Sequence, residues 1–470
     1  MLRVPEFPGL VNELVQLVLA HRGAFGQQRV YERAIALVFA EMVVWARHTV
    51  TQLLWALGVQ DEDWSAWYRL FSRGRFKEEA VNQVLLRETL RHVAADELYV
   101  IGGDGVQIWR DSRKMEGTSW LKCPRTPAWR PGIHRAQRFM NGSWLVPPEA
   151  GYSRAVILRF LPAFVEKAQR TCHEATKEWQ AALTFMGWVR GQLDSAGRLT
   201  QRILFLGDGS FDNIHLWQAR PDRVVVLVRT AKNRALYALP GAYTGRGAHR
   251  KYGERVPKPE AFLKQRSGWQ TTTLTVRARQ RRMVYRVEGP FVRRGAPTCP
   301  VFLLAVRGQS WTRRGNRRRR NPCFYLVNAT HQDGQWRLPL SAETLLFWAW
   351  QRWELEVAHR EAKSGFGVGD KQCWSPRAAV ASVQWSAWLY SLLLLAAYRT
   401  WGLTHHPHSS SAWWSGAPRW SFNYLWRALH VDCLNIPQFL PLLSLFPTNL
   451  AKNRPLATMI HDAMLAAAPA

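Results

Sequence analysis

The first 95 residues have apolar positions that recur at helical spacing, so we expect a helical domain over residues 1–95. Two of its helical segments flank an acidic turn, Asp61-Glu62-Asp63, and the second carries Arg69 and Arg73 near its end. Two interpretations stay open: a helix-turn-helix unit that enters the major groove of DNA, or a plain helical bundle with a solvated basic end. The helical segments are residues 30–48, 49–58 and 64–73.

Short apolar runs replace the helical period from residue 96 onward. Residues 98–101 read as a strand that enters Gly102-Gly103-Asp104, and residues 106–109 as its hairpin partner across a turn at Asp104-Gly105. Strands and helices then alternate, which predicts an α/β core over residues 96–229. The remaining expected elements are strands at 155–161, 202–206 and 224–228, a long helix at 164–193 and a short helix from Phe211.

The β-type runs of residues 230–338 are separated by Gly, Pro and Arg clusters, so this region reads as an all-β insertion. Helix resumes at Ser341, which has the character of an N-terminal cap, and residues 339–400 form the second part of the core. Residues 401–470 are expected to be a helical C-terminal region that could serve dimerisation. The expected strands of the insertion are 269–276, 283–287, 301–306 and 324–327.

One apolar stretch, residues 378–398, is nearly long enough to cross a membrane. Gln384 and several serines interrupt it, and a charged helix precedes it directly, so we favour a buried core helix and no membrane. The N-terminus lacks the pattern of a signal peptide. Six cysteines are scattered without a CxxC pair, which fits a reducing cytosol and gives little support for zinc.

The net charge of +30 in 470 residues favours a polyanionic partner. Nucleic acid is the first candidate, and an anionic membrane surface is the weaker one. The densest basic run contains Arg317, Arg318, Arg319 and Arg320, and we expect it to be a phosphate-contacting loop of the insertion. Lys114, in a second candidate loop, is expected to touch phosphate.

Three carboxylates carry the candidate chemistry. Asp104 and Asp208 each follow an apolar run and lie between two glycines, which lets a phosphodiester approach the backbone. Glu356 shares one helix face with Arg352 and Lys363. Glu354 and Glu361 are rotated off that face, and Asp212 ranks second to Asp208. The alternative is an ordinary salt-bridged surface, worth about 0.3–0.5 kcal/mol per pair. Clustered carboxylates need a cation, so we expect Mg²⁺ or Mn²⁺, as two ions.

The helix pattern resembles the motif Y-x2-R-x3-E-x6-K of DDE transposases of bacterial insertion sequences, in particular the insertion-sequence-four group. Arg352, Glu356 and Lys363 match its last three positions, whereas Ala349 stands where the family has Tyr, beside Trp350. The resemblance covers roughly residues 95–400. It implies an RNase H-like core with Asp104, Asp208 and Glu356 as catalytic metal ligands, and a β-rich insertion between the second aspartate and the glutamate.

The resemblance also implies a function. The chain would be a cytoplasmic, nucleoid-associated bacterial transposase that cuts inverted-repeat ends and joins them to target DNA, as a homodimer on DNA. A hairpin intermediate with a flipped base would use Trp353, with Trp336 as a second stacking residue. The alternatives are a nuclease of the same fold without strand transfer, and a catalytically inactive DNA-binding protein.

Overall fold

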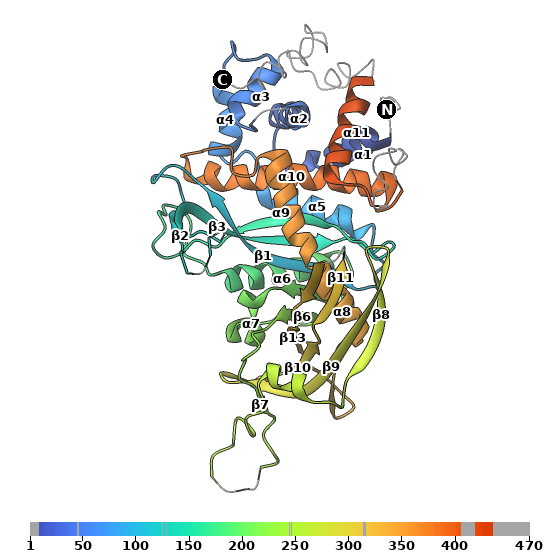
Figure 1. Cartoon of the computed structure of the whole chain (residues 1–470). Coiled ribbons are helices and arrows are strands. Elements are labelled where there is room, and N and C mark those ends of the chain that lie inside the picture. The colour runs from blue at the N-terminus through green and yellow to red at the C-terminus, as the bar shows by residue number, and fades with distance from the viewer. Residues whose placement is uncertain are drawn as a thin grey trace.

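The computed structural model describes residues 9–435, apart from residues 45–46, 125, 128, 244, 246, 314–315 and 406–418. A group of helices covers one end of a large mixed sheet, and a β-rich region forms the other end (Figure 1). The N-terminal helices are α1 (Gly9–Ala20), α2 (Gln28–Val43), α3 (Val50–Leu57), α4 (Ser65–Ser72) and α5 (Glu78–Leu90), with a 3₁₀ turn η1 (Arg22–Ala24) after α1. The predicted helical character of this region is thus present.

Local sequence signals set the ends of α3, the first helix of the predicted helix-turn-helix unit. The Thr49 side chain accepts a hydrogen bond from the Gln52 backbone N–H at 3.3 Å and caps its start. Gly58 ends it in the left-handed conformation with φ 66°, which glycine adopts without strain. Helix α4 follows, with Arg69 half-buried and Arg73 exposed. Whether this pair of helices enters a DNA groove stays a prediction.

The main sheet has eleven strands, of which nine follow the order β2-β3-β1-β5-β6-β13-β10-β9-β7, with β4 paired to β3 and β8 paired to β9. The pairs β1–β5 and β5–β6 are parallel, and the neighbours on either side are antiparallel. The strands are β1 (Tyr99–Trp109), β2 (Thr118–Lys122), β3 (Ile133–Leu145), β4 (Ala155–Pro162), β5 (Ile203–Gly207), β6 (Val224–Arg229), β7 (Tyr237–Ala238), β8 (Gln270–Val276), β9 (Arg279–Arg293), β10 (Ala296–Val306) and β13 (Cys323–Asn328).

Strand β1 corrects one prediction: the expected hairpin at Asp104-Gly105 is wrong. The strand runs without a turn, and β3 pairs with it from Ile101 to Trp109. Asp104 lies opposite Asn141 within this ladder and therefore does not close a strand. The local Asp-Gly turn signal is overridden because a partner strand some thirty residues further along the chain satisfies the hydrogen bonds of β1 on that side.

The predicted helix over residues 164–193 is also wrong in its first half, because α6 (Glu178–Ser195) begins only at Glu178. The backbone N–H groups of Thr171, Cys172 and His173 donate to the Glu116 carboxylate instead of to helical carbonyls. A long-range anchor therefore holds residues 163–177 in irregular structure. The short segment after β5 is the 3₁₀ turn η2 (Gly209–Phe211) followed by α7 (Ile214–Gln218).

The region predicted as an all-β insertion is rich in strands, and most of them extend the main sheet. Strand β13 pairs antiparallel with β6, and β10 and β9 follow outward. The arginine run was predicted to be a loop, and this prediction is wrong. It forms strand β12 (Asn316–Arg320), which pairs with β11 (Gln309–Arg313). The further elements of this region are η3 (Pro259–Lys264), β14 (Thr330–Gln332) and β15 (Gln335–Arg337).

Two helices follow the β-rich region and meet at Arg352. Helix α8 (Ala342–Gln351) starts at Ser341, whose side chain accepts a hydrogen bond from the Thr344 N–H as expected for a cap. Helix α9 (Trp353–Phe366) ends at Gly367, with φ 53°. Arg352 is the capping residue of both helices, which fixes the place at which its side chain leaves the backbone.

Helix α10 (Pro376–Trp401) contains the apolar stretch and is the one helix among the described residues that is long and apolar enough to cross a membrane. Its apolar window is completely buried, and it packs against α1, β4 and α9. This burial agrees with the expected core helix. Of the predicted C-terminal region, residues 401–405 and 419–435 are described, including α11 (Phe422–Asn435), and the predicted dimerisation stays a prediction.

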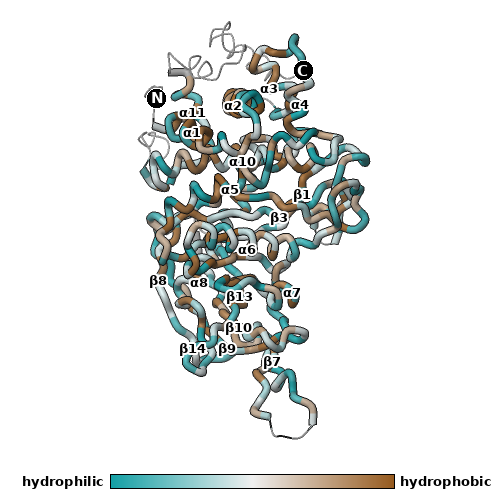
Figure 2. The backbone as a smooth tube through the Cα atoms, turned by 180° about the vertical axis from the view of Figure 1, so that it is seen from behind, coloured by the Kyte–Doolittle hydropathy of each residue, from teal (hydrophilic) through white to brown (hydrophobic). Residues whose placement is uncertain are grey.

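Glycines let helices approach the two faces of the sheet at β1 and β3. A Cβ at Gly102 would lie 2.6 Å from Leu355 Cδ1 of α9, and a Cβ at Gly142 of β3 would lie 2.7 Å from Phe185 Cε2 of α6. In Figure 1, α9 crosses in front of β1, and Figure 2 shows α6 from behind. The part of β1 that carries Asp104 is thus held between two helices.

We predict that Gly102→Val destabilises the protein by about 1–3 kcal/mol, because the added methyls must displace Leu355 and with it α9. The measurement is urea unfolding followed by circular dichroism. Gly187→Ala, in α6 with no atom near its Cβ position, is the control and should be neutral or stabilising by up to about 1 kcal/mol. Equal stability of wild type and Gly102→Val would contradict this account of the contact.

Candidate active site

The two aspartates lie at the same level of neighbouring parallel strands. The last paired residues of β1 and β5 are Gly102 and Leu206, and Asp104 and Asp208 each lie two residues beyond them. Strands in a sheet are about 4.8 Å apart, so these backbone positions are close. Because β5 ends at Gly207 while β1 continues, Asp104 stands where β1 has an open edge. The predicted closeness of the two aspartates is therefore present, although Asp104 reaches it from within a strand.

Asp208 is fixed by its own turn. One carboxylate oxygen accepts hydrogen bonds from the Ser210 backbone N–H at 2.8 Å and from the Ser210 hydroxyl at 2.6 Å. The residue caps η2 and has an extended backbone. This pattern is the ordinary Asx turn, and it uses Oδ1 of Asp208. The side chain is therefore held in one direction at the carboxyl end of β5.

Helix α9 carries Glu356 to the two aspartates. Leu355 is buried against Gly102, which places the first turn of α9 over β1. The Arg352 guanidinium donates to the Glu356 carboxylate at 2.5 Å and lies 3.7 Å from the Asp104 carboxylate. A single cation thus connects the helix carboxylate with the strand carboxylate. The sequence predicted the Arg352–Glu356 pair from their spacing, and it did not predict the contact to Asp104.

Asp104 is the common neighbour of the acidic groups. Burial raises the pKa of its carboxyl to about 7, against the opposing effect of Arg352, and the charges of Asp208, Glu356 and Glu178 act in the same direction as burial. A carboxyl with this pKa takes up a proton readily near neutral pH. A divalent cation would relieve the same repulsion, because it interacts with several of the carboxylates at once.

The three carboxylates are spaced more widely than a compact group of metal ligands. Among the described residues, the group of potential ligands whose atoms all lie within 4.8 Å of one another is Glu116, Cys172 and His173, so Asp104, Asp208 and Glu356 are spread more widely than that. Asp104 is the residue on whose carboxyl both Asp208 and Glu356 act.

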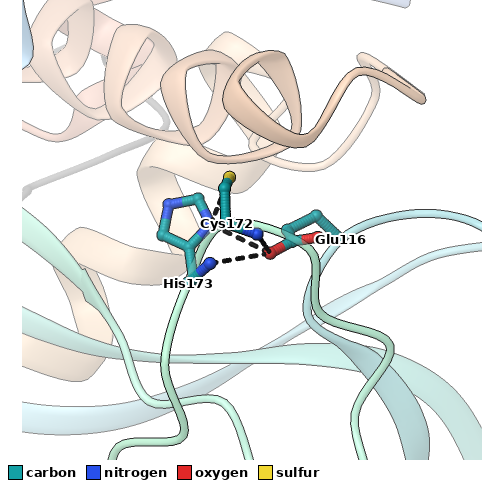
Figure 3. A group of neighbouring side chains, drawn as sticks. All are labelled: Glu116, Cys172 and His173. Atoms are coloured by element: carbon teal, nitrogen blue, oxygen red, sulfur yellow. Dashed lines mark hydrogen bonds and ion pairs between the residues drawn. The ribbon is translucent and has the colours of Figure 1, made fainter.

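The group around Glu116 is a structural anchor (Figure 3). Its carboxylate accepts hydrogen bonds from the backbone N–H groups of Thr171, Cys172 and His173, from the Thr171 hydroxyl and from His173 Nδ1. Burial opposes ionisation, but these hydrogen bonds outweigh it and lower the pKa of Glu116 to about 2. A metal ion would have to displace donors that already use both oxygens. Zinc, which the sequence supported poorly, is not favoured by this arrangement.

Two cavities open onto the carboxylates. One, of about 270 Å³, is lined by Asp104, Glu356 and Lys363 together with Trp109. The other, of about 810 Å³, is lined by Asp208, Arg352 and basic residues that include Arg229 and Lys232. Each cavity thus combines a carboxylate with cations, which suits a phosphodiester bound to metal.

The carboxylates that competed for the site have other partners. Glu354 is buried and lies 3.2 Å from Arg277 and 2.8 Å from Arg419. Glu361 accepts from Arg154 at 2.8 Å and from the Tyr390 hydroxyl at 3.0 Å. Asp212 lies 2.6 Å from both Arg234 and Arg293. These pairs hold elements together and do not reach the open edge of β1.

Of three further residues predicted to contact DNA, Lys363 lines the smaller cavity. Lys363 is exposed, and its Nζ lies 5.6 Å from the centre of the Trp109 ring. Trp353 is 47% exposed, so its ring is accessible to a base, as the hypothesis of stacking requires. Trp336, in β15, packs edge-on against His331 at 4.8 Å and is half-buried.

The remaining predicted DNA contacts are spread over the surface. Arg317, Arg318 and Arg319 of β12 are exposed, whereas the Arg320 guanidinium stacks on the Trp350 ring at 3.9 Å. Trp350, the neighbour of the missing motif Tyr, is thereby covered by the β-rich region. Lys114 is exposed and lies 6.0 Å from the Trp374 ring.

Sequence reasoning missed two residues beside the carboxylates. His359 lines the smaller cavity one turn after Glu356, and burial lowers its pKa to about 4, so the ring is neutral at pH 7. Its spacing from Glu356 was a usable signal. Glu178 is the first residue of α6 and acts on Asp104 across β1. No local pattern pointed to it, because only the fold brings it to β1.

Comparisons with known proteins point to one family. The chain matches the model of the DDE superfamily endonucleases over residues 24–289, which is more than half of its length and includes Asp104 and Asp208. A search of curated proteins found no match. Among solved structures, the chain is similar to a piggyBac transposase in a cryo-EM synaptic complex with hairpin DNA, at 11% identity and a TM-score of 0.35, covering 96% of this chain and 84% of that chain.

The raised pKa of Asp104 predicts the pH dependence of stability in the metal-free protein. An unfolded Asp ionises near pH 3.8 and folded Asp104 near pH 7, so the folded state retains a proton between these values. This contribution to stability is complete below pH 3.8 and is lost as the pH rises through 7, at up to about 1.4 kcal/mol per pH unit.

The test is urea unfolding in EDTA at pH 5 and pH 8. Wild type should lose more stability between these pH values than Asp104→Asn, which cannot ionise. The control Asp333→Asn changes a carboxyl that is 84% exposed and should follow wild type. A wild type and an Asp104→Asn variant with the same pH dependence would show that Asp104 ionises normally.

Proposed function

The chain belongs to the DDE superfamily endonucleases, and on that premise we propose that it is a DNA transposase that cleaves the ends of a mobile element and joins them to target DNA. The observation that carries the proposal is that Asp208, directly after β5, and Glu356, on α9, both act on the carboxyl of Asp104 in β1, with Arg352 between Glu356 and Asp104. The net charge of +30 supports a polyanionic substrate.

The acidic residues would hold Mg²⁺ or Mn²⁺, in the form of two ions. When bound, such ions activate water or a 3′-hydroxyl and stabilise the oxygen that leaves phosphorus. Asp104 is placed to serve both ions, Asp208 is oriented by Ser210, and Glu356 is carried by α9. The neutral ring of His359 adds no positive charge that would oppose the ions.

The basic residues of the site would position DNA. Arg352 lies between two carboxylates and neutralises them until cations and phosphate arrive. Lys363 stands at the mouth of the smaller cavity, where a phosphate next to the scissile bond would lie. Arg317, Arg318 and Arg319 offer a row of exposed charges on the β-rich region. Such contacts fix the register of a duplex and do not read its sequence.

The reaction would proceed in two chemical steps. Water attacks a phosphodiester at the end of the element and breaks its bond to the 3′-oxygen, which leaves a 3′-hydroxyl and a 5′-phosphate on the two sides of the nick in one strand. The 3′-hydroxyl then attacks a second phosphodiester, in the opposite strand to form a hairpin or in target DNA to join the element, and the 3′-oxygen of the attacked bond leaves as a new 3′-hydroxyl. The exposed Trp353 ring is offered to a flipped base in the hairpin variant of this route.

The finer parts of the proposal rest on the motif. The spacing of Arg352, Glu356 and Lys363 favours the insertion-sequence-four group of bacterial elements, and with it inverted-repeat ends, a homodimer on DNA and a cytoplasmic location. A nuclease without strand transfer is the second candidate, because the family that the chain matches is one of endonucleases. An assay that supplies a free 3′-hydroxyl end separates the two, since only the transposase forms a joined product.

The three carboxylates of the site are expected to be necessary for DNA cleavage. Asp104→Asn, Asp208→Asn and Glu356→Gln should each lower Mg²⁺-dependent nicking of an element end by at least about a thousandfold, while DNA affinity stays within a few-fold of wild type. The assay is gel separation of nicked DNA beside a mobility-shift titration. Asp333→Asn, an exposed carboxyl in the turn between β14 and β15, is the control and should keep full activity. A triad variant that nicks at the wild-type rate would remove that residue from the site.

The arginines of β12 are expected to contribute to the salt dependence of DNA binding. If Arg317, Arg318 and Arg319 contact phosphates, alanine at each should lower the slope of log K against log salt by about 0.9, because one counterion fewer is released. The measurement is fluorescence anisotropy of a labelled duplex at several salt concentrations. Arg91→Ala, at the end of α5 and 69% exposed, is the control. An unchanged slope in all three variants would place the DNA elsewhere.

A further inference from the structure

The Glu178 carboxylate lies against β1 next to Asp104, on the face of the strand opposite to Glu356. A Cβ built at Gly105 would lie only 2.1 Å from Glu178 Oε1 and 2.7 Å from Glu178 Cδ. No side chain fits there while Glu178 keeps its place. Gly105 has an ordinary backbone conformation, so the glycine is not needed for a turn. The absent side chain at Gly105 is therefore a passage for the Glu178 carboxylate.

Several contacts aim Glu178 at this position. Arg138 Nε donates to Glu178 Oε1 at 2.6 Å, and the Glu178 side chain is only 11% exposed. Arg138 lies opposite Gln107 in the β1–β3 ladder, two residues along from the pair Gly105–Met140, and therefore on the same face as Gly105. As the first residue of α6, Glu178 also follows directly on the segment that Glu116 anchors.

The Glu178 carboxylate lies against Gly105, the residue that directly follows Asp104 in β1. A cavity of about 1010 Å³ is lined by both Glu178 and Ser210, and Ser210 in turn donates to Asp208. The acidic residues thus approach Asp104 from both faces of the sheet, with Arg352 beside them on the α9 face and Arg138 on the α6 face.

An acidic side chain that is buried beside another carboxylate is unfavourable without a counter-charge. A structural role for Glu178 would be met by Arg138 and by the N-terminus of α6, both of which favour a negative charge. Neither of these roles requires the carboxylate to lie where a side chain at position 105 would be. The passage at Gly105 therefore needs a further reason.

We propose that Glu178 is a fourth acidic residue of the active site, which strengthens the binding of the divalent cation at Asp104 from the α6 face. The inference rests on the proposed function, since it concerns the same cation. Glu178 is a positioning residue here: its charge holds the cation, and the reacting atoms do not touch it. Gly105 is part of the same device, because it admits the carboxylate.

The test is calorimetric titration of Mn²⁺ into the full-length, metal-free protein without DNA. Glu178→Gln should weaken Mn²⁺ binding about tenfold, and Asp104→Asn should abolish it. Glu166→Gln, an exposed carboxylate that lines the same cavity, is the control and should bind like wild type. Wild-type affinity in Glu178→Gln, or a wild type that binds no Mn²⁺, would overturn the proposal.

Gly105→Ala provides a second variant, which keeps every carboxylate in the sequence. Its Cβ should expel Glu178 and weaken Mn²⁺ binding as much as Glu178→Gln does. In a Glu178→Ala background, Gly105→Ala should cost nothing more, because the passage is then empty. A further tenfold loss in the double variant would show that Gly105 acts through the backbone. Circular dichroism confirms that each variant is folded.

These results are independent of whether the protein is a transposase. Normal Mn²⁺ binding with the predicted losses, but no nicking of DNA, would keep Glu178 in the cation site and reject the proposed function. Normal nicking with unchanged Mn²⁺ affinity in Glu178→Gln would keep the function and reject the role of Glu178.

Discussion

Repulsion among the carboxylates around Asp104 is the constraint on which the site depends. Two like charges about 4 Å apart repel by roughly 4 kcal/mol at an effective dielectric constant near 20. Here three acidic residues act on the carboxyl of Asp104, and their effect adds to that of burial. Arg352 and Arg138 offset only part of the repulsion. A group of this kind is stable in a folded protein when a proton or a cation completes it, and the fold must otherwise hold the groups together by packing.

The packing that does so is built around a single strand. Strand β1 continues beyond the end of β5, so that its second half has one paired edge and one open edge. Glycines on its two faces admit Leu355 of α9 and Glu178 of α6 at distances that no other residue would allow. The helices are in turn fixed at a distance: α9 begins at the junction with α8, and the segment before α6 is tied to Glu116. The packing of β1, α6 and α9 thus determines where the acidic side chains come together, and the basic surface favours a polyanion as the molecule that binds there.

The sequence predicted what depends on local chemistry. Alternating or continuous apolar runs located β4, β5, β6, β10 and β13, and helical spacing placed Glu356 beside Arg352. Two of the errors have one physical origin, since each involves a partner distant in sequence. The Asp104-Gly105 turn did not form because β3 pairs along all of β1, and helix did not form over residues 164–177 because Glu116 takes the backbone N–H groups there. The arginine run became a strand because β11 pairs with it. Glu178 could not be found from sequence because no spacing relates it to Asp104.

The central claim is that Asp104, Asp208 and Glu356 share divalent cations, and a crystal structure of the protein with Mn²⁺ tests it most directly. Anomalous scattering from manganese locates the ions without assumptions about their ligands. The account predicts peaks within coordination distance of Asp104, at roughly 2.2 Å from its oxygens, with Asp208 and Glu356 completing the set. Manganese bound at Glu116, Cys172 and His173 with none at Asp104 would contradict it, because the carboxylates on β1, β5 and α9 would then be a structural ion-pair network.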